Sequence, residues 1–373
     1  MHVKIIYHMM PWEIDYMGLT FLNLKESLLT LRAMGDETKF TIDSVLNLSS
    51  YTIDWKKSKL PKEYFIEKYN TYSLLLKDPS KLNTTEEANG VYHDLICVHN
   101  KKIYEDNKIY GHLDLQKSCI GEEFDYYLHI CPDLWFDKHV FTSVIKGAQL
   151  QKEREPQNEF IITPSIFQMW DKSWNEIVHP NYKNKHHDDW WKIDVCEIKF
   201  YNDLNNARKE GDGFNFQYRK VQKFVKWAGW FDLYSKTLYE HVIKAPEEWN
   251  GYGPWDLFSM FACTVFHNNH KFKISQIITD QTISRYSTGP LNTSNKAAHT
   301  GDWLQTPIKK LLHLKKGNSK EELRQRYMKD GKDIMDDVRK WVGEREKEIL
   351  QNEELCQKLN IVKKQKIETP WKG

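Results

Sequence analysis

The sequence predicts an α/β fold, a mixed sheet flanked by helices, with a helical C-terminal extension. Three observations lead to this prediction. The first third of the chain alternates strand-like and helix-like segments, a later apolar segment runs out into Asp133, and apolar residues recur at helical spacing from Ser319 onward. A chain of 373 residues can bury one large core of this kind.

The opening elements follow from their periodicity. The apolar run Val3 to Tyr7 predicts a buried strand, and residues 17–34 have apolar side chains at helical spacing. Residues 39–50 are again strand-like and end in a polar turn, and residues 61–77 predict a helix with Pro61 near its first turn. Strand, helix, strand and helix in succession are typical of a parallel α/β layer.

Three further segments continue the pattern. Residues 110–124 predict a helix, residues 125–133 a buried strand that ends at Asp133, and residues 159–167 another strand. Residues from about 173 to 219 are polar, charged and aromatic with weak periodicity, which indicates an insertion that covers a site.

The C-terminal segment has its own pattern. Ser319 and Glu322 have the spacing of a capping box, and the apolar residues that follow fall on one helical face, most of all Leu323, Tyr327, Ile334, Val338, Trp341 and Ile349. We therefore expect a main domain over residues 1–317 and a helical segment with a frayed tail over residues 318–373.

Composition excludes several classes of protein. Lysine and arginine total 54 against 52 acidic residues, and this balance argues against a dedicated nucleic-acid scaffold. No apolar run approaches the length of a membrane span, and Pro11 interrupts the N-terminal run too early for a signal peptide. The six cysteines form no CxxC pair, which is typical of reduced thiols. We therefore expect a cytoplasmic protein.

The stretch "WNGYGPWDLF" at residues 249–258 has the most unusual composition in the chain. It places one carboxylate, Asp256, among glycines and aromatic rings, and a second aromatic stretch precedes it at residues 226–240. A tight turn before a helix would explain the glycines. The 14 tryptophans admit a functional explanation too, because indole rings stack on the apolar faces of sugars as well as filling cores.

The order of these segments resembles that of the GT-A glycosyltransferases, especially family 2 and the β-1,4-galactosyltransferase type. The similar segments are residues 111–133, 226–240 and 251–256, together with the N-terminal strands, so that the resemblance covers roughly residues 1–270. The chain also resembles chains from viruses of marine bacteria, and this resemblance implies a viral source and so a host cytoplasm.

The resemblance implies a transferase that moves a sugar from a UDP- or GDP-sugar donor to a hydroxyl acceptor, with a divalent metal, Mn²⁺ or Mg²⁺, and inversion at the sugar carbon. Asp256 would be the catalytic base, and its aromatic neighbours would desolvate it and raise its pKa. The donor would bind at Asn47, Gly111 and Asp133, the metal at Asp133 and His313, and the acceptor at Gly229, Trp230, Tyr252, Gly253 and Trp255.

The sequence also departs from the family pattern. Asp133 is followed by Leu134 and Trp135, so that the second acid of the metal motif arrives only at Asp137. Asp256 follows Trp255 where the family has glutamate, and Asn47 stands where it often has aspartate. These losses keep open a non-catalytic carbohydrate-binding protein, and Asp133 could simply cap a turn.

Two alternatives involve nucleic acid. The chain could glycosylate modified bases of viral DNA, which would need a basic groove such as "KKSK", "HKFK" and "HLKK" could line. A protein that stacks bases on its aromatics would need interleaved arginines, which are sparse here.

Lys315, Lys316 and Lys320 could meet a diphosphate, although a solvated basic face is commoner. The cluster at residues 186–189, "HHDD", has metal-binding residue types but adjacent positions. The sequence does not indicate the donor sugar, the acceptor or the oligomeric state.

Overall fold

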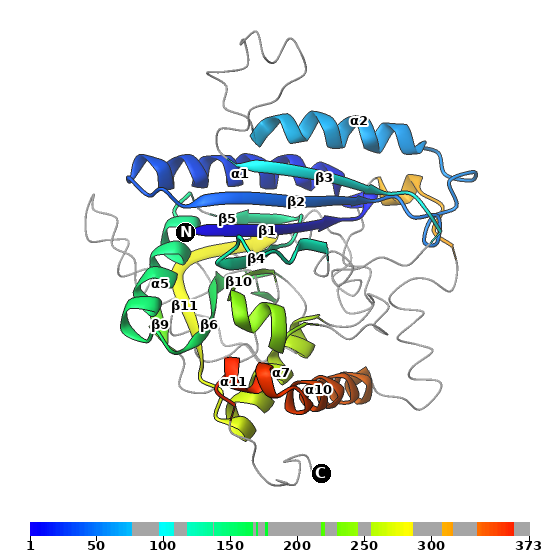
Figure 1. The fold of residues 1–373 in the computed structure, drawn as a ribbon. Helices are drawn as coiled ribbons and strands as arrows, with labels where there is room; N and C mark the ends of the chain where they lie inside the picture. The colour runs from blue at the N-terminus through cyan, green and yellow to red at the C-terminus, as the bar shows by residue number, and fades with distance from the viewer. Residues whose placement is uncertain are drawn as a thin grey trace.

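A computed structural model describes residues 1–76, 97–107, 118–136, 138–166, 169–170, 176–177, 218–220, 230–244, 255–285, 308–315 and 334–361. Within these residues the chain forms one large mixed sheet with helices on both faces (Figure 1). The predicted α/β fold class, a mixed sheet flanked by helices, is confirmed.

The sheet has nine strands within the described residues, in the order β3-β2-β1-β4-β10-β6-β11-β5, with β9 paired to β11. Their bounds are β1 His2–Met9, β2 Lys39–Asn47, β3 Val98–Tyr104, β4 Tyr126–Ile130, β5 Leu134–Phe136, β6 Glu159–Ile166, β9 Tyr218–Lys220, β10 Phe231–Ser235 and β11 Ile274–Arg285. Strands β1 to β4 are mutually parallel, whereas β10 is antiparallel to both β4 and β6. A separate two-stranded sheet pairs β7 (Met169–Trp170) with β8 (Glu176–Ile177).

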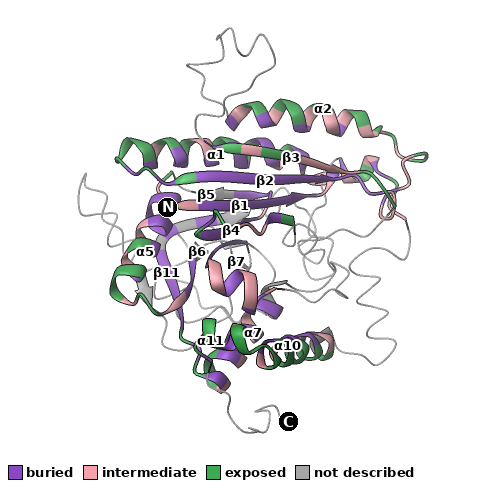
Figure 2. Cartoon of the chain, viewed as in Figure 1, coloured by how far each residue is buried: buried purple, intermediate pink, exposed green. Residues whose placement is uncertain are grey.

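Helices α1 (Ile14–Ala33), α2 (Lys62–Ser73) and α5 (Val140–Arg154) cover one face of the sheet. Alternate residues of β1 and β2 point into this layer, which explains why Val3, Ile5 and Tyr7 are fully buried. Their partners are apolar residues of the helices, such as Phe21 of α1 and Phe65 of α2. Figure 2 shows the result: the central strands are buried, whereas the helices alternate buried residues with intermediate and exposed ones.

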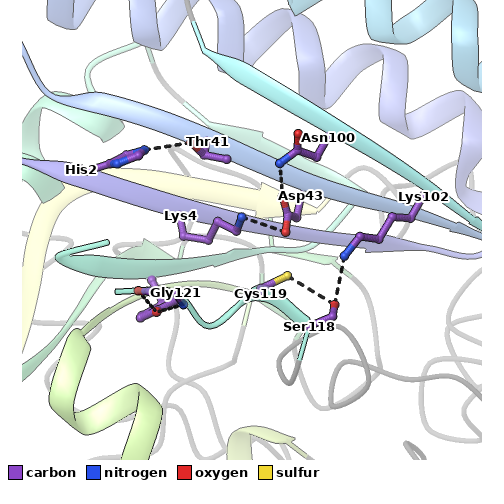
Figure 3. Close-up of polar contacts among 10 residues, drawn as sticks. His2, Lys4, Thr41, Asp43, Asn100, Lys102, Ser118, Cys119 and Gly121 are labelled. Carbon is purple, nitrogen blue, oxygen red and sulfur yellow. Dashed lines mark hydrogen bonds and ion pairs between the residues drawn. The ribbon is translucent and has the colours of Figure 1, made fainter. Parts of the chain in front are cut away.

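The other face of the same strands is partly polar. Lys4 on β1 and Asp43 on β2 form a buried ion pair with a distance of 2.8 Å between Nζ and Oδ2, and Asn100 of β3 donates to Asp43 Oδ1 at 2.8 Å (Figure 3). The Lys4 ammonium also lies 4.4 Å from the centre of the Phe124 ring. Burial by itself raises the pKa of Asp43, but the hydrogen bonds from Lys4 and Asn100 outweigh it and leave the pKa below its usual value. Every charged group in this network therefore has a partner, and we assign it a structural role.

A helix is predicted over residues 110–124, in the segment that covers this network. Residues 118–119 are helical, whereas residues 120–124 are not and include a turn at residues 122–123, so the helix ends before its predicted end. Residues 110–117 lie outside the described residues. Cys119 is buried beside Asp43 and Phe124 is buried beside Lys4, so both side chains contact the sheet.

The C-terminal helices pack under this second face. Helix α10 (Ile334–Gln351) contacts α7 (Trp255–His270), and α11 (Glu353–Lys358) follows it. Their buried residues share one cluster with Tyr127, Tyr234 and the short π-helix η5 (Leu238–Val242). The predicted C-terminal helix is thus found packed on the main body, while its predicted start at Ser319 lies outside the described residues. In the described part of the chain, no helix is long and apolar enough to cross a membrane.

Candidate functional site

The candidate site lies at the carboxyl edge of β1, β2 and β4. From β1 the chain moves outward to β2 and β3, and then returns to β4 on the other side of β1. The strand order therefore reverses between β1 and β4. Open α/β sheets bind their ligands outside the carboxyl ends of the strands at such a reversal, because the connections leave in opposite directions and open a crevice.

Asn47 is the last residue of β2 and lies at this edge. Its side chain is buried, with Nδ2 3.3 Å from His8 Nε2 of β1. Its Oδ1 accepts a hydrogen bond from the backbone of Ser49 at 3.1 Å, and Ser49 Oγ accepts one from the backbone of Tyr51. The loop that leaves β2 is therefore shaped by two successive side-chain turns, and Asn47 is both a candidate donor-binding residue and the residue that starts this loop.

Asp133 lies three residues past the end of β4, in the turn before β5. The hydroxyl of Tyr7 donates to the carbonyl of Pro132 at 3.0 Å, and Thr20 Oγ1 lies 2.7 Å from the same oxygen and 3.0 Å from the carbonyl of Leu134. Burial raises the pKa of Tyr7 well above its ordinary value, so the phenol stays a neutral donor. The carbonyls of the two residues that flank Asp133 are thus held from β1 and α1. The Asp133 side chain itself is fully buried.

Trp230 reaches the same edge because β10 runs antiparallel to β4. The backbone of Cys131 donates to the carbonyl of Trp230 at 2.8 Å, directly beside the Asp133 turn. The Trp230 side chain is only 6% exposed and belongs to the core beneath the edge. The structure therefore brings this predicted acceptor residue next to Asp133, with its ring largely inside the protein.

His313 is brought to the edge by a contact that spans most of the chain. Residues 308–315 lie against the loop 52–59 that follows β2, through a bridge between Ile53 and Leu314. The backbone of Asp54 donates to the carbonyl of His313 at 2.8 Å, and the backbone of His313 donates to Ser58 Oγ at 3.0 Å. The His313 side chain is exposed. In Figure 1 this late segment, drawn in orange, lies beside the ends of β2 and β3.

Trp12 and Lys309 also lie at this edge, and the sequence did not single them out. Trp12 belongs to the short 3₁₀ helix η1 (Pro11–Glu13) that follows β1, and Lys309 begins the 3₁₀ helix η7 (Lys309–Leu311) of the late segment. The Lys309 ammonium lies 5.3 Å from the centre of the Trp12 ring. The two residues are nearly 300 positions apart in the chain, so no local pattern could predict their contact. The sequence shows only that Pro11 and Trp12 directly follow the first strand.

The described residues do not form the predicted metal site. Among them no group of three or more His, Cys, Asp or Glu residues could hold a metal ion. Asp133 is buried in its turn, and His313 is exposed on the loop. Asp137, the second acid of the predicted motif, lies outside the described residues. The described residues of the predicted site therefore do not by themselves fit a metal ion.

Asp256 lies in the first turn of α7, which begins at Trp255, so the glycine-rich stretch does precede a helix. Helix α7 ends at His270, just before β11 starts at the opposite, amino edge of the sheet. At a rise of about 1.5 Å per residue, the backbone of Asp256 is about 21 Å from that end. The side chains of Trp255 and Asp256, and the whole of Gly111, Gly229, Tyr252 and Gly253, lie outside the described residues.

No protein-family model matches this chain, and no curated protein sequence matches it either. Solved structures similar to it include S. aureus TarS 1–349 in complex with UDP-GlcNAc, with 11% identity, a TM-score of 0.38, and coverage of 79% of this chain and 61% of that one. S. aureus TarS has 12% identity, a TM-score of 0.35 and coverage of 74% and 35%. TarS 1–349 has 12% identity, a TM-score of 0.34 and coverage of 74% and 58%.

This chain thus spans 61% or less of the TarS chains that it resembles. Similarity at this level assigns no activity. The structure defines a class of protein. It is an α/β protein with a mixed sheet, helices on both faces and a candidate ligand crevice at the reversal of strand order.

Proposed function

We propose that this protein is a glycosyltransferase that moves a sugar from a nucleotide-sugar donor to a hydroxyl acceptor. The observation that carries the proposal is the convergence of Asn47, Asp133 and Trp230. These residues come from three separate motifs of the sequence, and all three lie at the carboxyl edge where the strand order reverses.

The proposed roles follow from position. Asn47 and the loop after it bind the nucleoside of a UDP- or GDP-sugar, and the Asp133 turn lies towards the diphosphate and sugar. Asp256 accepts the proton of the acceptor hydroxyl while the hydroxyl oxygen bonds to the anomeric carbon. The bond from that carbon to the diphosphate oxygen breaks on the opposite face, so the nucleoside diphosphate leaves and the configuration inverts.

Ligand-dependent stability tests the donor site. Nucleoside diphosphates and nucleotide sugars with uracil and guanine bases would be added to the wild-type protein, with and without Mn²⁺, in thermal unfolding. A ligand that binds only the folded state raises the midpoint, and we expect this for one nucleotide. The same screen reports whether binding needs the metal. If no nucleotide shifts the midpoint, the proposal fails.

The base is tested by Asp256→Asn. We expect turnover to fall by about 10²-fold to 10⁴-fold while the affinity for the donor is retained, because the carboxylate acts on the acceptor. Asp336→Asn, at an exposed position of α10, is the control and should leave turnover unchanged. Equal turnover of Asp256→Asn and wild type would remove Asp256 from the mechanism.

A carbohydrate-binding protein without turnover is the second candidate. The burial of Asp133 and the absence of a second acid next to it favour this alternative. It predicts that free oligosaccharides raise the unfolding midpoint whereas nucleotides do not, which is the reverse of the result expected for the transferase.

A further inference from the structure

We infer that Lys309 binds the diphosphate of the nucleotide donor. The inference rests on the proposed function and adds a residue that none of the sequence motifs indicated. Lys309 would supply a positive charge at the place where the donor carries its negative charge.

The position of Trp12 locates Lys309 in the crevice. β1 lies between β2 and β4, so the chain that leaves β1 passes between the Asn47 end of one neighbour and the Asp133 turn of the other. Trp12 is the third residue past the end of β1. The Lys309 ammonium, 5.3 Å from the centre of its ring, therefore lies beside the segment that leaves the central strand, near the reversal of strand order where the ligand is expected.

The segment that carries Lys309 is fixed to the same edge. Ile308 and Leu312 on either side of η7 are buried in the core. The backbone of Lys59 donates to the carbonyl of Leu311 at 2.8 Å, and the backbone of Lys315 donates to the carbonyl of Thr52 at 2.9 Å. These bonds and the Ile53–Leu314 bridge hold η7 against the loop that begins at Asn47. The main chain at Lys309 is therefore anchored beside the crevice, which limits the entropy lost when its side chain binds an anion.

Charge at this edge favours an anionic ligand. Residues 308–315 read IKKLLHLK and contain three lysines, one histidine and no acid. Two acids in the described residues of this edge, Glu13 and Asp54, have partners of their own. Glu13 Oε2 accepts a hydrogen bond from the backbone of Met10 at 2.6 Å, and Asp54 pairs with Lys57 at 3.1 Å. The hydrogen bond from Lys57 lowers the pKa of Asp54, so that carboxylate is ionised and occupied near neutral pH.

The chemistry of the transfer needs a cation here. When the bond between the sugar and the diphosphate breaks, negative charge grows on the leaving oxygen, and a fixed ammonium nearby stabilises that charge more than it stabilises the intact donor. Lysine suits this role because its ammonium is a compact charge with three donors. The contact of its ammonium with the Trp12 ring holds the cation near the site.

The test compares ligands with and without phosphate. Lys309→Gln, Lys309→Arg and the control Lys310→Gln, an exposed neighbour on the same short helix, would be titrated calorimetrically. The ligands are the nucleoside diphosphate found in the thermal screen, its nucleoside and inorganic pyrophosphate. We expect Lys309→Gln to weaken the diphosphate and pyrophosphate by about tenfold or more, because a charge-assisted hydrogen bond is lost, and the nucleoside by less than about twofold. Lys309→Arg should retain most of the affinity, and Lys310→Gln should change neither.

Three outcomes would overturn the inference. If Lys309→Gln weakens the nucleoside as much as the diphosphate, Lys309 only holds Trp12 and the loop in place. If it weakens neither, the phosphates lie elsewhere, and the proposed function still stands because wild type binds nucleotide. If wild type binds no nucleotide at all, the proposed function fails first and this inference fails with it.

Discussion

The Asp133 turn shows how single residues prepare the candidate site. A carboxylate at the end of a strand keeps its position only if the neighbouring peptides are held. Here Tyr7 and Thr20 bind the carbonyls on both sides of Asp133 from inside the core. Both hydroxyl groups are fully buried, so they have no water to replace a lost partner. The hydroxyl groups thus belong to the site although neither is a candidate ligand of the donor.

Replacing Thr20 by valine tests this arrangement. The substitution keeps the shape of the side chain but leaves the carbonyl of Pro132 with one donor fewer. We expect the free energy of unfolding to fall by about 1–3 kcal/mol and the donor affinity to fall as well, because the turn can then shift. Urea unfolding and nucleotide titration measure the two effects.

Thr30→Val is the matched control on the same helix. The Thr30 hydroxyl donates to the carbonyl of Glu26 in an exposed turn of α1, far along the helix from the site. We expect a change in unfolding free energy within about 0.5 kcal/mol and no change in donor affinity. If Thr20→Val lowers stability but leaves donor affinity as in wild type, the Asp133 turn does not support the donor site.

At the scale of elements, α10 is the clearest case of a helix joined to the main body. Val338 and Trp341 are buried against α7, and His270 at the end of α7 contacts Glu346 of α10 with 2.5 Å between Nε2 and Oε1. The same apolar cluster includes Phe258 and Phe266 of α7. Although the sequence suggested a boundary at residues 317 and 318, the packing predicts that both sides unfold together.

Trp341→Ala measures how strongly α10 is held. Removing a buried indole loses its transfer free energy and leaves a cavity, and we expect the free energy of unfolding to fall by about 3–5 kcal/mol. Lys340→Ala, an exposed neighbour, should change it by less than about 0.5 kcal/mol. A single transition for both variants, followed by far-ultraviolet circular dichroism in urea, supports one cooperative unit. A separate early transition in Trp341→Ala would instead make residues 318–373 independent.

At the scale of the whole molecule, the sequence predicted single strands and helices better than it predicted which of them pair. The strand at Val3, the helix after it and the strand that ends near Asn47 all follow from apolar periodicity, and the structure confirms them. The antiparallel insertion of β10 and the bridge from Ile53 to Leu314 have no local signature, because pairing depends on partners far apart in the chain. Hence the sequence indicated Asn47, Asp133 and Trp230 singly, but not that Lys309 would join them.

Acid stability is a property of the whole molecule that follows from two partly buried histidines, His99 and His241. Burial lowers the pKa of His99 to about 4, and burial together with the charges of Lys358 and Arg345 lowers that of His241 to about 4. In the unfolded chain both titrate near the ordinary value of about 6.5. Between these values the unfolded state binds protons that the folded state does not, so stability is complete above about pH 6.5 and falls as the pH drops towards 4. Asp36 and Asp43, whose pKa values are lowered, add a further loss below about pH 4.

The expected slope is up to about 1.4 kcal/mol per pH unit for each histidine, because one proton separates the two states. Urea unfolding at several pH values between 4.5 and 7.5 measures it. His99→Asn should lose one such contribution to the slope. Because the substitution also removes the contact between His99 Nε2 and Ser44 Oγ at 2.6 Å, the variant is compared with wild type by its slope and not by its absolute stability. His313→Asn, at an exposed position, is the control and should keep the wild-type slope. A flat stability profile above pH 5 in wild type would contradict this prediction. It would mean that the two histidines bind protons in the folded state as readily as in the unfolded state.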